Sequence, residues 1–274
     1  MEKSIHKYIV LVYHLQIKSF KNLIRTVLKK LMRFSNPPES SPWDNHHFGP
    51  PPCYTLESAD DVYRPILDLC FEYFNGTQVQ GDIYEFGTYK GYTARLISEN
   101  MALRNWKGKL HLFDSFEGLP EIDTSCDLNS YEVAVNKSWF KGQMKLYPGI
   151  VSAIAGALSE TIGTNNFIIH PGFYKDTLPE LVSDNKIALC NIDCDLYGST
   201  WTVLNHLIEN DLFHDGSIIL FDDYNCNRAQ PAMGERKAIS ELFGENKAYT
   251  ISPFYAYGWH GQSFFIHKNK GIGL

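Results

Sequence analysis

Acidic side chains follow apolar runs at four places along the chain, and they are the residues whose chemistry is easiest to place. The apolar runs are typical of buried strands, and each ends in one acid or in two closely spaced acids: Glu85, Asp114, Asp193 with Asp195, and Asp222 with Asp223. Ligands of parallel sheets bind beyond the carboxyl ends of the strands. A purely structural sheet does not require an acid at all four ends, so the pattern predicts a binding site.

Three of these acids, Asp193, Asp222 and Asp223, are expected to converge if their two strands are neighbours in the sheet. Carboxylates that lie close together need a cation, and oxygen ligands favour Mg²⁺, Mn²⁺ or Ca²⁺ over zinc. A bound divalent ion would lower the pKa of a substrate hydroxyl, and a nearby carboxylate would then take its proton. For any one acid alone, a helix cap or a surface turn is the competing interpretation.

The turn from Glu85 to Gly91 joins one predicted strand to the next helix. Gly87 and Gly91 allow a tight turn and a close approach of the backbone to a ligand. Their spacing, E-x-G-x-x-x-G, is not the G-x-G-x-x-G of dinucleotide-binding enzymes and lacks the G-K-S/T ending of a phosphate loop. Asp114 ends the following strand, where an acid can accept both ribose hydroxyls of a nucleoside. Together these residues favour a nucleoside cofactor, although each alone also fits a structural turn.

Strands and helices alternate around these residues and must form the scaffold that positions them. We predict strands at 81–87, 109–114, 167–170, 187–193, 216–222, 247–252 and 262–267, and helices at 59–75, 90–102, 150–162, 176–183, 199–209 and 233–243. Unbroken apolar strands separated by helices indicate a mostly parallel sheet covered on both faces. The predicted fold class is therefore α/β and doubly wound, in a domain covering residues 56–274.

The composition is that of a globular protein with enough apolar material for a large core. The chain has 274 residues, of which 44% are hydrophobic and 20% are charged. Its net charge of −6 argues against a general nucleic-acid binder. Six cysteines without a C-x-x-C pair indicate reduced thiols in a cytoplasmic protein, and neither a disulfide framework nor a zinc site.

The first 55 residues are predicted to be a helical extension followed by a linker. Residues 4–33 contain no Gly or Pro and carry apolar side chains at helical spacing beside a basic polar face. We expect the apolar face to pack on the body of the protein or on a second subunit, which predicts a homo-oligomer, and not to bind an anionic membrane surface. Six prolines in residues 35–53 predict a linker without regular structure, which would also be able to cover a site as a lid.

Several longer strings around the acids resemble the macrocin O-methyltransferase family, which methylates sugar hydroxyls on natural products. The matching strings follow one another in order: Gly81–Gly91, Asp114–Pro120, Pro171–Pro179, Ile192–Thr200, Asp222–Asn225 and Gly234–Ala238. Two of them, D-S-F-E-G-L-P and G-F-Y-K-D-T-L-P, are too specific to agree by chance. The resemblance therefore covers most of the predicted sheet.

This resemblance implies a class I, Rossmann-like methyltransferase fold with a seven-stranded sheet whose last strand is antiparallel. It implies S-adenosylmethionine beside a set of turn residues: Glu85, Gly87, Thr88, Gly91, Asp114, Ser115, Phe116 and Gly172. It also implies Mg²⁺ between Asp193, Asp222 and Asp223, with Asp223 as the general base and Asp193 beside it at the catalytic centre. The acceptor would be a hydroxyl of a small molecule, with a glycoside or glycan as the first candidate and a catechol-like phenol as the second.

Two other functions stay open at this point. Asp193-Cys194-Asp195 is a D-x-D string of the kind used by metal-dependent glycosyltransferases, although that interpretation leaves the Glu85–Gly91 turn unexplained. A non-catalytic S-adenosylmethionine-binding protein would keep the same fold and cofactor pocket. Residues 121–165 depart from the family pattern and would shape the acceptor pocket together with the first 55 residues. His260 is a candidate substrate contact or second base.

Overall fold

The computed structural model describes residues 42–45, 56–181, 185–244, 246 and 248–269. The chain divides into two compact units, Met1–Asp44 and Asn45–Leu274, and the fold below is that of the second unit. The helices predicted within residues 4–33, and Cys53, lie outside the described residues. A boundary between residues 55 and 56 stays a prediction.

The described residues of the segment that was predicted to lack regular structure form a 3₁₀ turn, η1 (Pro42–Asn45). The prediction was wrong at these four residues. Proline fits the first position of a helical turn, because its fixed φ is already helical and its missing N–H would have no partner there.

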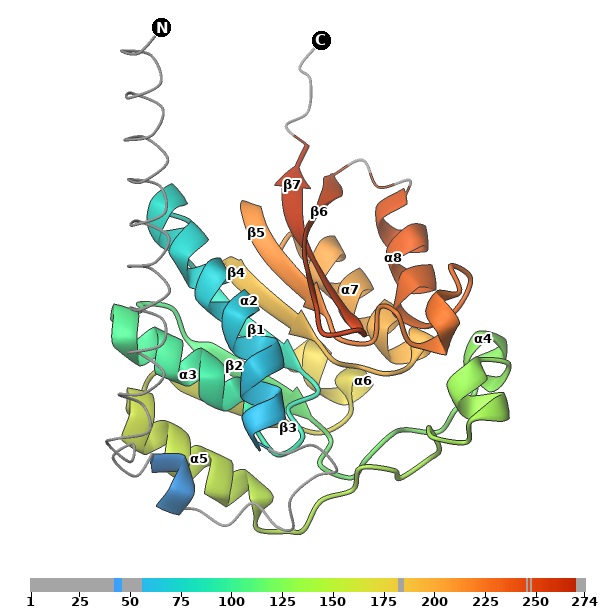
Figure 1. Cartoon of the computed structure of the whole chain (residues 1–274), viewed down its shortest axis with the longest axis horizontal. Coiled ribbons are helices and arrows are strands. Elements are labelled where there is room, and N and C mark those ends of the chain that lie inside the picture. The colour runs from blue at the N-terminus through green and yellow to red at the C-terminus, as the bar shows by residue number, and fades with distance from the viewer. Residues whose placement is uncertain (1–41, 46–55, 182–184, 245, 247, 270–274) are drawn as a thin grey trace, which may run out of the picture. The chain divides into compact units, whose positions relative to one another are not determined.

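Seven strands form one sheet in the order β3-β2-β1-β4-β5-β7-β6 (Figure 1). The strands are β1 (Asp82–Phe86), β2 (Leu110–Asp114), β3 (Phe167–Pro171), β4 (Ile187–Ile192), β5 (Phe213–Phe221), β6 (Tyr249–Tyr257) and β7 (Gly261–Lys268). Strands β1 to β5 pair in parallel, and β7 is antiparallel to both β5 and β6. The mostly parallel sheet with an antiparallel last strand is thereby confirmed.

Six helices cover the two faces of this sheet. One face carries α2 (Leu56–Thr77), α3 (Tyr92–Arg104) and α5 (Ile150–Ile162), and the other carries α6 (Tyr174–Thr177), α7 (Tyr197–Glu209) and α8 (Gly234–Gly244) (Figure 1). Strands β1 and β4 are buried at every position because both of their faces are covered. Among the described residues, no helix is long and apolar enough to cross a membrane.

The region between β2 and β3 is only partly as predicted. Helix α5 has the predicted bounds, but a short helix α4 (Ser125–Leu128) and a π-helical turn η2 (Tyr131–Val135) precede it and were not foreseen. Elements this short have no measurable hydrophobic period, so pattern alone does not reveal them.

The helix predicted at 176–183 is wrong. The structure has α6, which ends at Thr177, and then a 3₁₀ turn η3 (Leu178–Glu180). Pro179 lies at the first turn of η3, where its missing N–H is tolerated; inside a longer α-helix it would remove a hydrogen bond. The predicted residues 182 and 183 lie outside the described residues.

Candidate active site

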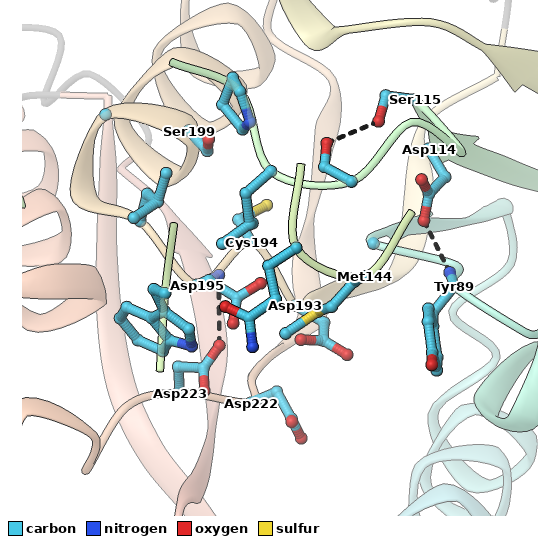
Figure 2. Close-up of a pocket in the computed structure, with 18 of the residues that line it drawn as sticks. Tyr89, Asp114, Ser115, Met144, Asp193, Cys194, Asp195, Ser199, Asp222 and Asp223 are labelled. Atoms are coloured by element: carbon cyan, nitrogen blue, oxygen red, sulfur yellow. Dashed lines mark hydrogen bonds between the residues drawn. The ribbon is translucent and has the colours of Figure 1, made fainter. Parts of the chain in front are cut away.

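One cavity of about 1670 Å³ lies at the carboxyl ends of the parallel strands. Gly87, Asp114, Asp193 and Asp222, which follow or end β1, β2, β4 and β5, all line it (Figure 2). Strand β4 pairs with both β1 and β5, so the ends of these strands meet at one edge of the sheet. The structure therefore brings together the residues that the sequence placed at strand ends.

Gly87 is the point of closest approach between the strand ends of β1 and β4. Its backbone N–H donates to Phe113 O at 2.9 Å, and the N–H of Asp193 donates to Phe86 O at 2.8 Å. Gly87 has φ +91°, and a Cβ atom there would lie 1.8 Å from the carbonyl oxygen of Asp193. Only glycine fits, because any side chain would collide with the neighbouring backbone.

Asp114 holds two loops of the cavity wall through its carboxylate. Oδ2 accepts the backbone N–H of Tyr89 at 2.6 Å (Figure 2). Oδ1 accepts the backbone N–H of Phe116, also at 2.6 Å. Tyr89 and Phe116 have φ of +47° and +54°, which are strained values for non-glycine residues. Burial raises the pKa of Asp114, and the two N–H bonds oppose that shift. The hydrogen bonding of ribose by Asp114 stays a prediction.

Gly172 completes the wall next to Asp114. Its N–H donates to the carbonyl oxygen of Asp114 at 2.9 Å, and its φ of +141° turns the chain away after β3. Ser115 Oγ donates to Gly118 O at 2.9 Å and so braces the loop after β2 (Figure 2). These turns place backbone groups along the cavity wall beside the ring of Tyr89.

Not every predicted cofactor residue reaches the cavity. Among the described residues, the lining includes Gly87, Thr88, Asp114, Ser115 and Gly172, but not Glu85, Gly91 or Phe116. Glu85 is 1% exposed, and burial raises its pKa to about 8. Asn191 Nδ2 donates to Glu85 Oε1 at 3.3 Å. Gly91 instead begins α3 with φ +78°, which explains its place in the turn sterically.

A group of three carboxylates faces the cavity from the ends of β4 and β5. One oxygen from each of Asp193, Asp195 and Asp223 lies within 4.8 Å of the others. Asp195 has φ +58°, and its N–H donates to Asp223 Oδ2 at 3.2 Å (Figure 2). The sequence showed Asp195 at a strand end but did not select it as a ligand. We call these three residues the acidic cluster.

Asp222 lies outside the acidic cluster. Its carboxylate Oδ1 accepts the hydroxyl of Tyr63 at 2.7 Å and lies 3.4 Å from Nδ1 of His260. It points away from Asp223 although the two residues are adjacent (Figure 2). Sequence reasoning did not select Tyr63, because a tyrosine inside a helix carries no pattern that indicates such a contact.

Burial and mutual repulsion dominate the electrostatics of the acidic cluster. Both raise the pKa values of Asp193 and Asp195 well above the usual range, with burial as the larger cause. The pKa of Asp223 is raised to about 7 by burial and then by the charge of Asp222. Glu235, a buried acid at the start of α8, accepts the N–H of Asp223 at 3.0 Å. So many buried acids in one place suit a hard divalent cation.

The loop that follows β5 is fixed by its neighbours. Arg236 Nε donates to Tyr224 O at 2.8 Å, and its terminal nitrogen donates to Asn225 Oδ1 at 2.6 Å. The N–H of Asn225 donates to the carbonyl oxygen of His260 at 2.8 Å. The β6–β7 hairpin therefore reaches back to the strand end that carries two of the acids.

The unforeseen elements α4 and η2 close the remaining side of the cavity. Asp127 in α4 accepts the N–H groups of Tyr197 at 2.7 Å and Gly198 at 3.0 Å, and so caps the start of α7. Leu119, Trp139 and Leu196 form a small separate core beneath them. Trp139 lines the cavity, as does the exposed Trp259.

The chain is similar in sequence to proteins that are named as O-methyltransferases. The sequence profile of the macrocin O-methyltransferase (TylF) family matches residues 63–243. The demethyldecarbamoylnovobiocin O-methyltransferase of Streptomyces niveus is 26% identical over 187 residues, which cover 64% of this chain and 65% of that protein. The mycinamicin III 3''-O-methyltransferase of Micromonospora griseorubida is 25% identical over 181 residues, covering 64% of this chain and 68% of that protein. The chain thus spans about two thirds of the length of these relatives.

A solved structure shares the architecture. The crystal structure of CalS11, a calicheamicin methyltransferase, matches with a TM-score of 0.61 at 20% identity, over 74% of this chain and 77% of that one. This likeness shows the fold alone, which is that of class I methyltransferases. The family profile spans more than half of the chain and includes all four strand ends that carry acids. The chain therefore belongs to the macrocin O-methyltransferase family.

Proposed function

We propose that the protein transfers a methyl group from S-adenosylmethionine to a hydroxyl of a small glycosylated molecule, with the help of a divalent cation. One observation carries the proposal: the glycine turn after β1 and the acidic cluster after β4 lie in direct contact at Gly87 and Asp193. A methyl donor held by the turn would therefore face a hydroxyl held at the acids, within one cavity.

The proposed cofactor site uses the backbone-lined half of the cavity. Gly87 and Gly172 line this half without side chains, and Thr88 and Ser115 add hydroxyl groups to the wall. Asp114 has two bonded oxygens, each with a further lone pair that would accept a ribose hydroxyl. Family membership supports this assignment, since the named relatives are O-methyltransferases.

The proposed cation site uses the acidic cluster. Three carboxylates with oxygens within 4.8 Å of one another are the donors that Mg²⁺ or Mn²⁺ prefers. Asp222 would join Asp193, Asp195 and Asp223 from the side on which Tyr63 holds it. A cation bound there would lower the pKa of an acceptor hydroxyl.

The transfer itself is a displacement at the methyl carbon. The acceptor oxygen forms the new O–C bond, the S–C bond breaks with its electron pair going to sulfur, and S-adenosylhomocysteine leaves. We assign the hydroxyl proton to the carboxylate of Asp223, which lines the cavity, with Asp193 beside it. The remaining contribution of the chain is to hold the two reactants in line and at contact distance.

The acceptor is proposed to be a sugar-type hydroxyl of a natural product. Two relatives support this, because they are named as O-methyltransferases of a novobiocin precursor and of mycinamicin III. The cavity supports this proposal with two broad, flat and exposed side chains in its lining, Trp201 and Trp259. Trp201 is 38% and Trp259 is 70% exposed, which is unusual for tryptophan unless a partner or ligand covers it.

Calorimetric titration tests the proposed methyl donor. We expect wild-type protein to bind S-adenosylmethionine and S-adenosylhomocysteine saturably, with a free energy of about −8 kcal/mol for a micromolar site. Asp114→Ala should abolish this binding while the protein stays folded by circular dichroism. Absence of binding in the folded wild type would overturn the proposal, and nucleotide-sugar donors would be the next ligands to test.

A further inference from the structure

The adjacent carboxylates of Asp222 and Asp223 turn in different directions after β5 (Figure 2). Asp223 reaches the N–H of Asp195 at 3.2 Å and so joins the acidic cluster. Asp222 is only 9% exposed, yet its carboxylate turns to partners that come from distant parts of the chain. Residues from other elements therefore set the orientation of the Asp222 carboxylate.

Tyr63 is the first of these partners. Its hydroxyl donates to Asp222 Oδ1 at 2.7 Å across 159 positions of sequence. The Tyr63 ring packs against the rings of Tyr257 at 5.8 Å and His260 at 6.2 Å, so it has little freedom to move. A short bond from a fixed hydroxyl to a carboxylate is charge-assisted and directional.

His260 is the second partner, and it contacts both the main chain and the side chain of Asp222. Its Nδ1 donates to the carbonyl oxygen of Asp222 at 2.8 Å and lies 3.4 Å from Oδ1. A carbonyl oxygen only accepts, so this nitrogen carries a hydrogen. His260 lies beyond residues 63–243, where the family profile matches, and Tyr63 stands at its first position.

The geometry points to Tyr63 and His260 as positioning residues that act through Asp222 on the binding of a divalent cation beside the acidic cluster. The inference rests on the proposed function, because it concerns the cation site of that reaction. Both contacts use Oδ1 of Asp222, so Oδ2 is the oxygen that would bind a cation placed between Asp222 and the acidic cluster. Groups that hold a metal-binding carboxylate in place typically change metal affinity by about 10–100-fold when they are removed.

A purely structural role for the same bond would give a different result. If Tyr63 only tied α2 to the end of β5, its loss would lower the stability of the fold and leave the cation affinity of the folded protein unchanged. Cation affinity, measured separately from stability and from cofactor affinity, therefore distinguishes the two roles.

The experiment compares Tyr63→Phe with Tyr257→Phe. Tyr257 is a matched control, because its ring lies 5.8 Å from Tyr63, it is 2% exposed, and among the described residues its hydroxyl has no hydrogen-bond partner. Each change removes one hydroxyl from the same aromatic group. Binding of Mn²⁺ is measured from the electron paramagnetic resonance signal of the free ion, with and without S-adenosylhomocysteine.

We expect Mn²⁺ affinity to fall by about 10–100-fold in Tyr63→Phe and to stay at the wild-type value in Tyr257→Phe. Affinity for S-adenosylhomocysteine should be the same in all three proteins. His260→Ala should weaken Mn²⁺ binding as well, and His260→Asn should restore part of it, since the asparagine amide replaces the Nδ1 donor.

Unchanged Mn²⁺ affinity in folded Tyr63→Phe would overturn the inference, as would a wild-type protein that binds S-adenosylhomocysteine but no Mn²⁺. Loss of S-adenosylhomocysteine binding in the wild type is a separate outcome. It would refute the proposed function, while the Mn²⁺ titrations without cofactor would still decide between the two roles of Tyr63.

Discussion

The two halves of the cavity are built from different materials. The half next to β1 and β2 is made of backbone, with Gly87, Gly172 and the N–H groups held by Asp114. The half next to β4 and β5 is made of carboxylates, of which Asp195 is buried and Asp193 and Asp223 are half-buried, and one oxygen of each lies within 4.8 Å of the others. Steric fit governs the first half and charge governs the second, so the same kind of substitution should have different consequences in each.

The largest effect is expected from Gly87→Ala, at the point where the halves touch. The new Cβ atom would lie 1.8 Å from the carbonyl oxygen of Asp193, at a φ of +91°. We expect the free energy of unfolding to fall by about 3 kcal/mol or more, with loss of both cofactor and cation binding. Urea unfolding followed by fluorescence measures the first effect, and calorimetry measures the second.

Gly76→Ala is the control for this substitution. Gly76 lies in α2 with nothing within 4 Å of an added Cβ atom. Alanine should be neutral there or stabilise the helix by up to about 1 kcal/mol. Equal losses of stability in the two variants would show that the contact at Gly87 has no special role.

Replacing an acid by its amide should change stability in opposite directions in the two halves of the cavity. Asp114→Asn places an N–H₂ group opposite one of two backbone N–H donors and should cost about 1–3 kcal/mol of stability. Asp193→Asn, in protein stripped of metal at pH 8, removes one of several like charges and should stabilise by about 1 kcal/mol or more.

With excess Mg²⁺, the wild type should become more stable than Asp193→Asn, the reverse of the order without metal. Wild type gains about 2.7 kcal/mol when the free ion is at one hundred times its dissociation constant, and the variant gains less. Thermal unfolding with EDTA and with Mg²⁺ measures both states. A destabilised, metal-free Asp193→Asn would contradict the view that repulsion dominates this half.

A pH dependence of stability is also expected in the metal-free protein. Burial and neighbouring charges raise the pKa of Asp223 to about 7, so the folded state binds a proton that the unfolded state releases near pH 4. Stability should therefore decline as pH rises from about 4 to about 7. Saturating Mg²⁺ should flatten this slope, and a slope of opposite sign in EDTA would show that Asp223 is already charged throughout that range.

The sequence predicted the sheet more completely than it predicted the site. The sequence predicted that Asp193, Asp222 and Asp223 would converge if β4 and β5 were neighbours; the strands do pair, and Asp193 and Asp223 lie close together, but Asp222 turns to Tyr63. The sequence also singled out Gly87, because a positive φ and a close backbone approach require glycine at that position. These features depend on local pattern and on the order of strands, which are both written along the chain.

Other parts of the site depend on contacts that local pattern does not encode. The position of the Asp195 carboxylate follows from a φ of +58° beyond the strand end. Tyr63 and His260 reach Asp222 from remote elements, and no spacing rule connects them. Helix α4 has a local N-cap in Thr124, but its Asp127 also accepts two N–H groups at the start of α7, a contact that no local pattern encodes.

The antiparallel strand β7 has a consequence for how the protein is made. It inserts between β5 and β6, so the buried apolar strand β5 has an unpaired edge until the ribosome has delivered both α8 and the final hairpin. An open edge of this kind can pair with another chain. The same late hairpin brings His260 to Asp222. During synthesis, the folding of this hairpin would therefore cover the edge of β5 and complete the reaction centre in the same step.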